Sequence, residues 1–328
     1  MAKIYYFLGH EQFHPEKLVE FARTAETAGF DGLFVSEHFN PWVDDKGASG
    51  FAFSTLGAIA AVTQRIELMT GVITPLFRYH PAVIAQAAAT LDRISGGRFY
   101  LGVGTGESIN ETPLGIEFPK YTERSERMIE ALKIMRRLLD KEKLSFAGNY
   151  YKTENVKLYS PPLHSIPILM AAQGPKSAEL AAEYSDGIIV SIKDPREQNE
   201  KVIVPANKKR KLLGKAKLTI VTNRWTVFAK NEEQALKALA PWRGLRSPGR
   251  DTAYDPKLLQ EEADLLNKNE ILSKYTVLTS AEDYIDAYSP LITQLNSDIV
   301  VIQTTTHENQ DELIRMIGKQ VLTKLKRL

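Results

Sequence analysis

Short apolar segments alternate with amphipathic segments along most of the chain, and this alternation constrains the fold more than any other feature. The apolar segments read as buried strands, and the segments between them, several opened by proline at the first helical position, read as helices. Eight strand–helix pairs favour a (β/α)8 TIM barrel over an open doubly wound sheet. The predicted strands span residues 4–8, 32–36, 66–73, 98–103, 166–172, 187–192, 218–228 and 298–303.

The length of 328 residues fits one barrel that carries insertions. No repeat, linker or low-complexity segment divides the chain, so we expect a single barrel domain over residues 1–328. Three longer segments without strand character, near residues 107–120, 146–163 and 243–272, are expected as insertions. At the C-terminal face of the barrel, where loops follow the strands, such insertions would form lids.

Composition excludes several classes of protein and site. No segment is long and apolar enough to cross a bilayer, and the first residues enter a predicted strand without signal-peptide architecture, so we expect a cytoplasmic protein. The chain has no cysteine, which excludes disulfides, thiolate metal sites and a cysteine nucleophile. A net charge of +2 gives no reason to expect nucleic acid. We predict no metal site.

The second predicted strand ends in Ser36-Glu37-His38-Phe39-Asn40-Pro41-Trp42. This stretch places a carboxylate, an imidazole and an indole where Pro41 prevents the strand from continuing. Ligands of parallel α/β folds bind at the carboxyl ends of the strands, so Glu37, His38 and Trp42 are the first candidates for chemistry. The alternative is an ordinary strand terminus whose polar residues cap the next element.

Other predicted strand ends also carry glycines and polar residues. Gly71 and Thr74 follow the third strand, and Gly102-Val103-Gly104-Thr105-Gly106-Glu107 ends the fourth. The third glycine of that run lies one residue too early for a dinucleotide-binding turn, so we interpret the run as backbone that a flat ligand approaches closely. Gln173-Gly174-Pro175-Lys176 opens a helix whose free N–H groups predict a phosphate site. Each segment taken singly could be a tight turn.

Four stretches together resemble one known family. They are Ser36 to Trp42, the string Thr-Pro-Leu-Phe-Arg-Tyr-His-Pro-Ala-Val-Ile-Ala-Gln at 74–86, Gly-Val-Gly-Thr-Gly-Glu at 102–107 with Asn110, and Gly-Asn-Tyr-Tyr at 148–151. These stretches resemble the F420-dependent glucose-6-phosphate dehydrogenases of the bacterial luciferase-like superfamily. The resemblance implies an oxidoreductase that uses the deazaflavin coenzyme F420, oxidises glucose 6-phosphate at C1 to the lactone, and forms a homodimer.

The resemblance also implies which residues hold the coenzyme. A cis peptide between Gly71 and Val72 would bulge against the face of the ring, and the start of the helix at residue 175 would take the phosphate end. The first carboxylate of the site is usually Asp in the family and is Glu37 here, so its reach is longer. The coenzyme-binding residues implied are Glu37, Gly71, Val72, Thr74, Gly106, Asn110, Gln173, Gly174, Pro175 and Lys176.

Catalysis and substrate binding are implied in the same way. Hydride loss from C1 of the sugar requires a base for the C1 hydroxyl, which suits His38, and a proton for the reduced ring, which the family assigns to Glu107. The sequence does not decide which of His38 and Glu107 accepts the hydroxyl proton and which donates a proton to the ring. Trp42 would shape the catalytic pocket. The substrate-binding residues implied are Glu11, Trp42, Ser191, Lys193, Arg250 and Lys274, the three cations taking the phosphate.

Three alternatives remain open at this point. An F420-dependent alcohol dehydrogenase would need a neutral pocket in place of the cations. An FMN-dependent monooxygenase could use the same barrel, although the Thr-Gly-Glu turn at 105–107 and the Phe-Arg-Tyr string at 77–79 resemble the deazaflavin enzymes. A non-catalytic binding barrel would retain the fold but has little use for His38, Trp42 and Glu107 together.

Overall fold

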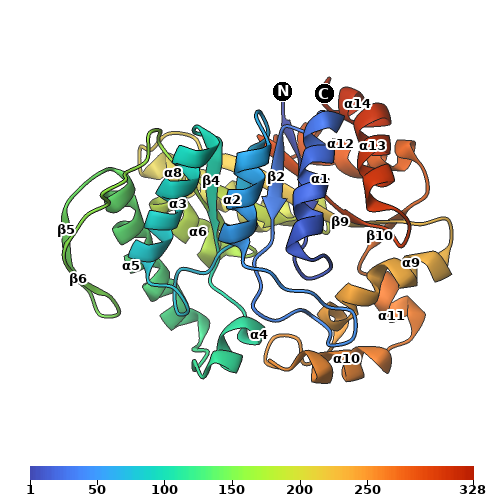
Figure 1. Cartoon of the computed structure of the whole chain (residues 1–328), viewed down its shortest axis with the longest axis horizontal. Coiled ribbons are helices and arrows are strands. Elements are labelled where there is room, and N and C mark those ends of the chain that lie inside the picture. The colour runs from blue at the N-terminus through green and yellow to red at the C-terminus, as the bar shows by residue number, and fades with distance from the viewer.

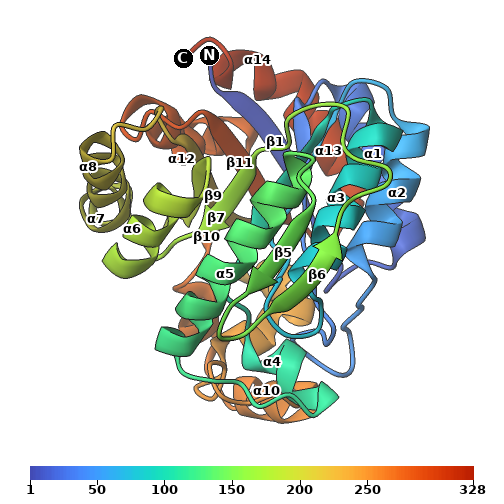
Figure 2. The same cartoon turned by 90° about the vertical axis from the view of Figure 1, so that its left-hand side faces the viewer.

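The computed structural model describes residues 1–328 and contains a closed barrel of eight parallel strands (Figures 1 and 2). The strand order is β11-β1-β2-β3-β4-β7-β8-β9, and β9 pairs with both β8 and β11, so that no edge of the barrel is open. The predicted TIM barrel is confirmed. The strands are β1 (Lys3–Leu8), β2 (Gly32–Val35), β3 (Glu67–Thr70), β4 (Phe99–Val103), β7 (Ile168–Ala171), β8 (Gly187–Ser191), β9 (Thr219–Phe228) and β11 (Ile299–Thr305).

One main helix follows each barrel strand and packs on its outer side. Proline opens α1, α3 and α6, where its missing N–H costs nothing, and left-handed glycines at positions 29 and 96 end α1 and α3. These local signals account for the regular alternation seen in the sequence. The eight helices are α1 (Pro15–Ala28), α2 (Ala52–Val62), α3 (Pro81–Ser95), α5 (Tyr121–Leu139), α6 (Pro175–Tyr184), α8 (Val204–Leu212), α12 (Ala281–Thr293) and α13 (Gln310–Gln320).

Alternate residues of each strand serve two separate cores. In β1, Ile4, Tyr6 and Leu8 pack against the helices, whereas Tyr5 and Phe7 fill the inside of the barrel. This period of two follows from the pleat of a strand. The barrel interior is therefore a packed core, and ligands are restricted to its ends.

Shorter helices gather at one end of the barrel. In Figure 1, α4, α10 and α11 lie below the barrel, at the end opposite the two chain termini. Because the N-terminus leads into the start of β1, this is the end where the strands finish. The shorter helices are α4 (Ser108–Glu111), α7 (Pro195–Gln198), α9 (Glu232–Leu239), α10 (Pro256–Asp264), α11 (Lys268–Leu272) and α14 (Leu322–Leu325), with single-turn or irregular helical segments at Thr112–Leu114, Asn199–Ile203 and Ala240–Arg246.

Three strands lie outside the barrel and have no counterpart among the predicted ones. β5 (Leu144–Ala147) and β6 (Lys152–Val156) form an antiparallel hairpin that lies in front of the helix layer in Figure 2. β10 (Thr276–Leu278) extends the sheet beside the end of β9. These strands are short and largely exposed, so they lack the apolar runs that revealed the barrel strands. No helix combines the length and the apolarity that crossing a membrane requires.

Gly32 of β2 tests how tightly the barrel interior is packed. A Cβ atom at Gly32 would overlap the ring of Tyr5, which is fully buried, whereas a Cβ at Gly57 in α2 meets no atom within 4 Å. We expect Gly32→Ala to lower the free energy of unfolding by roughly 1–3 kcal/mol through overpacking. Gly57→Ala should raise it by roughly 0.5–1 kcal/mol, because alanine loses less backbone entropy in a helix. Urea unfolding of the two variants measures both, and equal effects would contradict the packing argument.

Candidate active site

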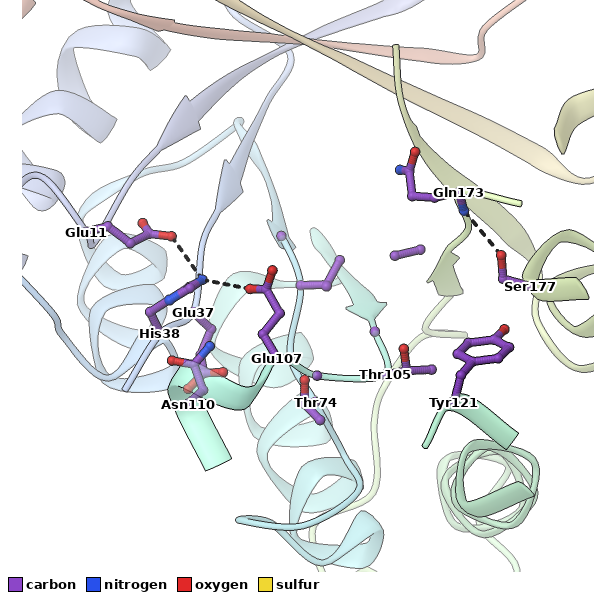
Figure 3. Close-up of a pocket in the computed structure, with 15 residues that line it drawn as sticks. Glu11, Glu37, His38, Thr74, Thr105, Glu107, Asn110, Tyr121, Gln173 and Ser177 are labelled. Atoms are coloured by element: carbon purple, nitrogen blue, oxygen red, sulfur yellow. Dashed lines mark hydrogen bonds and ion pairs between the residues drawn. The ribbon is translucent and has the colours of Figure 1, made fainter. Parts of the chain in front are cut away.

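The ends of strands β1 to β4 and β7 surround a pocket of about 350 Å³ (Figure 3). The pocket brings together most residues that the sequence singled out for the coenzyme and the chemistry. Trp42, Gly174, Pro175, Lys176, Ser191, Lys193, Arg250 and Lys274 do not line it. Its lining residues are Glu11, Glu37, His38, Gly71, Val72, Thr74, Gly104, Thr105, Gly106, Glu107, Asn110, Tyr121, Ala171, Gln173 and Ser177.

Backbone forms much of one wall of this pocket. The peptide between Gly71 and Val72 is cis, as predicted. A Cβ at Gly104 would lie 2.7 Å from Cγ2 of Val72, and Gly106 has a φ of +83°, a conformation that favours glycine. A flat ligand can therefore approach the main chain directly along this wall.

His38 lies between two carboxylates. Its Nδ1 donates to the carbonyl oxygen of Asn40 at 3.0 Å, and its Nε2 is 3.4 Å from Glu11 and 3.3 Å from Glu107. Since both ring nitrogens face acceptors, the imidazole holds two protons in this arrangement. Burial by itself lowers the pKa of His38, but the two carboxylates outweigh it and raise that pKa to about 9.

Each carboxylate has a second partner that fixes its direction. Ser36 donates its hydroxyl to Glu11, and Arg250 donates a guanidinium N–H to Glu107 at 2.5 Å. Desolvation acts to raise the pKa of Glu107, but His38 and Arg250 outweigh it and hold that pKa at about 2. In the protein without ligands, Glu107 is therefore a carboxylate across the physiological range.

Trp42 supports this cluster from behind the pocket wall. Its side chain is buried, and its ring centre lies 5.0 Å from that of His38 and 5.3 Å from the guanidinium carbon of Arg250. The indole thus packs against His38 and makes a cation–π contact with Arg250.

Glu37 faces the pocket but is already bound by the protein. Arg78 donates one N–H to each carboxylate oxygen of Glu37, at 2.8 and 2.9 Å. Its Nε also donates to the two carboxylate oxygens of Glu111, at 3.1 and 3.2 Å. One arginine thus serves two buried carboxylates. Burial raises the pKa of Glu111 to about 6, against the opposing attraction of Arg78.

At the other end of the pocket, polar groups near the start of α6 lack partners. The Ser177 hydroxyl accepts the N–H groups of Gln173 and Gly174, so these two are occupied. The hydroxyl of Tyr121, which lines the pocket as Ser177 does, is buried without any hydrogen bond. Together with the free N–H groups of the first turn of α6, it suits an anionic end of a ligand. Lys176 is exposed outside the pocket.

A second hollow of about 290 Å³ lies beside the end of β8. It contains three of the predicted substrate residues, Ser191, Lys193 and Lys274, but not Arg250. Arg224 of β9 and Arg246 complete a set of four cations. The full lining is Ser191, Ile192, Lys193, Arg224, Trp225, Arg246, Ser273, Lys274, Tyr275 and Thr276, which includes no carboxylate.

Sequence reasoning missed several residues of these sites. Arg78 lies within the string at 74–86, but nothing in its spacing showed that it reaches Glu37 and Glu111. Tyr121 belongs to a helix that reads as an ordinary amphipathic element. Arg224 is a polar residue inside a long strand, and that interruption of an apolar run was the one signal that could have marked it.

Comparison with known proteins agrees with this geometry. The luciferase-like monooxygenase family matches residues 3–288. An F420-dependent glucose-6-phosphate dehydrogenase of Microbacterium testaceum is 33% identical over 98% of this chain and 97% of its own. An F420-dependent hydroxymycolic acid dehydrogenase of Mycobacterium tuberculosis is 45% identical over 57% of this chain and 52% of its own. The structure of an F420-dependent secondary alcohol dehydrogenase with an F420–acetone adduct superposes with a TM-score of 0.89 at 29% identity, covering 98% of both chains.

The carboxylate pair held by Arg78 predicts a pH dependence of stability. Folding raises the pKa of Glu111 from its ordinary value of 4.5 to about 6, so the folded protein binds more protons in this window and its stability falls as pH rises from 4.5 to 6. Glu111→Gln should remove this decline, which we expect to be on the order of 1–2 kcal/mol. Urea unfolding between pH 4.5 and 6.5 measures it. Parallel curves for the two proteins would contradict the assignment.

Proposed function

Because this chain belongs to the luciferase-like monooxygenase family, we propose that it is a coenzyme F420-dependent dehydrogenase that oxidises glucose 6-phosphate, or a related sugar 6-phosphate, at C1. The curated relatives that match nearly the whole chain support the coenzyme and the reaction class. The observation that carries the choice of substrate is the hollow with four cations and no carboxylate.

The first pocket fits the coenzyme in shape and in donor chemistry. The backbone of Gly71, Val72 and Gly106 would lie against the ring, and Thr74 and Asn110 offer polar side chains beside it. The unpartnered hydroxyl of Tyr121, with the N–H groups at the start of α6, would take the phosphate end. Coenzyme F420, when bound, supplies a deazaflavin carbon that accepts hydride.

The second hollow would hold the phosphate of the substrate. Lys193 and Lys274 stand in a lining that includes no carboxylate, and the Nε of Arg246 is buried without a hydrogen-bond partner. An anion can therefore bind these groups without first displacing a carboxylate. The ends of β7 and β8 are neighbours in the barrel, so the phosphate site lies next to the strand that ends at the coenzyme pocket.

We assign to His38 the role of the base that removes the proton of the C1 hydroxyl. As C1 loses hydride, the hydroxyl must lose its proton to leave the lactone carbonyl, and only the neutral imidazole can accept it. Nε2 of His38 is 3.3 Å from Oε2 of Glu107 and 3.4 Å from Oε1 of Glu11. The resemblance implies Glu107 as the acid on the coenzyme side. Because its pKa is about 2 in the free protein, Glu107 would have to gain its proton after the ligands bind. Trp42 packs against His38.

An alcohol dehydrogenase is the second candidate, favoured by the high structural similarity to the secondary alcohol enzyme. Such an enzyme would have no use for four cations around a second hollow. An FMN-dependent monooxygenase would differ in the coenzyme that copurifies with the protein.

The first test is the loss of the visible absorbance of oxidised F420 on mixing with protein and substrate. We expect bleaching with glucose 6-phosphate and none with glucose or isopropanol, since only the phosphate binds the four cations. Bleaching with isopropanol alone would support F420 as the coenzyme and refute the proposed phosphate site. No bleaching, with yellow FMN bound to the purified protein, would refute the coenzyme as well.

The same assay tests the cations. Lys193→Met and Lys274→Met should each raise KM for glucose 6-phosphate at least about tenfold, the loss expected for one charge-assisted hydrogen bond. The Kd of F420 should stay unchanged. Lys143→Met, at an exposed lysine just before β5, is the matched control and should alter neither constant.

A pH profile tests the role of His38. Because the pKa of His38 is about 9 in the free protein, kcat/KM for sugar oxidation should rise about tenfold per pH unit between pH 6 and 8 and level off near pH 9. His38→Ala should abolish the rise and most of the turnover. If kcat/KM of the wild type did not change with pH, or if His38→Ala kept full turnover, His38 would not be the base, and a carboxylate would be the next candidate.

A further inference from the structure

Glu37 lines the coenzyme pocket but exposes almost none of its carboxylate there. Its side chain is only 2% exposed. Arg78 donates to both of its oxygens, and the Tyr79 hydroxyl donates to Oε1 at 3.2 Å. A carboxylate accepts about four hydrogen bonds, so the protein itself already supplies most of the donors that Glu37 can use. Little of this side chain remains for a ligand.

Arg78 connects Glu37 to a second buried carboxylate, that of Glu111. Its Nε donates to both oxygens of Glu111, and the two side chains are 4% and 0% exposed. The three residues lie on different segments at the mouth of the barrel: Glu37 follows β2, Arg78 lies between β3 and α3, and Glu111 is the last residue of α4. We call Glu37, Arg78 and Glu111 the charge triad. The triad joins the end of β2 to α4.

The position of α4 depends on contacts of this kind. It is a single helical turn, and one turn has too few internal hydrogen bonds to be stable alone. Ile109 packs into the barrel core, the amide oxygen of Asn110 accepts two main-chain N–H groups from the loop after β2, and Ser108 donates to a main-chain carbonyl oxygen. Glu111 adds the charged contact of the turn, through Arg78.

This turn carries two groups that line the coenzyme pocket. Glu107 directly precedes α4, and Asn110 is its third residue; Figure 3 shows both beside the pocket. Oε2 of Glu107 lies 3.3 Å from Nε2 of His38. Because Glu107 and Asn110 belong to one short segment, a displacement of α4 moves both of them relative to His38, which follows β2.

We propose that the charge triad positions α4, and that Glu37 anchors Arg78 instead of binding the coenzyme. The proposal rests on the function proposed above and changes the role that the resemblance implies for Glu37. The extra methylene of Glu37, where the family usually has Asp, is used inside the protein, since both carboxylate oxygens accept hydrogen bonds from Arg78. Held by the triad, α4 keeps Glu107 beside His38 and keeps Asn110 in the pocket wall.

The charges of the triad explain why loss of the Arg78 fork would displace α4. Burial raises the pKa of Glu111 to about 6, against the attraction of Arg78, so Glu111 is an anion at neutral pH. One guanidinium therefore compensates two buried carboxylates. Without its planar fork, at least one buried anion lacks a partner, which is unfavourable. Since Glu37 directly follows a barrel strand, the single turn of α4 is the part that can move.

The first experiment is a titration of His38 by proton NMR of the full-length protein, without coenzyme. The chain has six histidines, and His38→Ala assigns the signal. Burial lowers the pKa of His38, but Glu11 and Glu107 outweigh it and hold that pKa at about 9. Arg78→Lys keeps the charge and loses the fork, so α4 should shift, Glu107 should move away from His38, and the midpoint should fall by more than about half a pH unit. An unchanged midpoint would overturn the positioning role.

Three further variants separate this role from a general loss of stability. Glu111→Ala leaves Arg78 paired with Glu37, so no buried charge lacks a partner, and it should lower the midpoint in the same way. Glu111→Gln keeps an acceptor for Arg78 and should behave as the wild type. Arg136→Lys is the matched control, because Arg136 also lies beside two carboxylates, near the start of β8 at the opposite end of the barrel. An equal fall in Arg136→Lys would show that lost stability alone moves the His38 signal, and would overturn the proposal.

The second experiment is the Kd of F420, measured by the change in its fluorescence on binding. Glu37→Gln keeps the length of the side chain and one acceptor oxygen for Arg78. We expect its Kd to stay within about twofold of the wild type, whereas loss of a charged contact with the coenzyme would raise it about tenfold or more. A tenfold rise would overturn the anchoring role of Glu37. If the wild type binds FMN and not F420, the proposed function fails, whereas the titration of His38 still decides whether the triad positions α4.

Discussion

Closure of the sheet is the constraint on which the rest of the structure depends. Pairing of β9 with both β8 and β11 removes every free edge of the barrel and aligns eight parallel strands in one direction. All the strand ends therefore meet at a single mouth. For this reason Glu11 and Gln173 line one pocket although they are distant in sequence, and Arg250 reaches Glu107 in its wall.

Within that mouth, charge compensation decides how each residue can act. Buried carboxylates are stable only with cationic or hydrogen-bonding partners, and the protein distributes few cations among several of them. Arg78 serves Glu37 and Glu111, while His38 and Arg250 serve Glu11 and Glu107. The four cations of the second hollow, in contrast, have no acidic partner in its wall. This contrast supports the proposal that the chemistry takes place in one pocket and that the anion binds in the other.

Sequence reasoning succeeded where a signal was local and failed where it depended on distant contacts. Eight apolar runs revealed the eight barrel strands, because burial on both faces makes such strands apolar throughout. The strand predicted to reach residue 73 ends at Thr70, and beyond it Ile73 pairs with Val103 only through an isolated bridge. The hairpin of β5 and β6 went unrecognised because its strands are mostly exposed, and exposed strands carry no apolar pattern.

The sequence by itself determined the class of fold, the family resemblance and most of the residues that line the coenzyme pocket. Strand periodicity, proline at helix starts and glycine at tight approaches are all properties of neighbouring residues, so they can be read along the chain. Only the tertiary structure decided which cation meets which carboxylate. It placed Arg78 on Glu37, and it placed Arg250 on Glu107 rather than in the hollow with the lysines. Such pairings join segments up to 143 residues apart, and their geometry is set by barrel closure rather than by any local pattern.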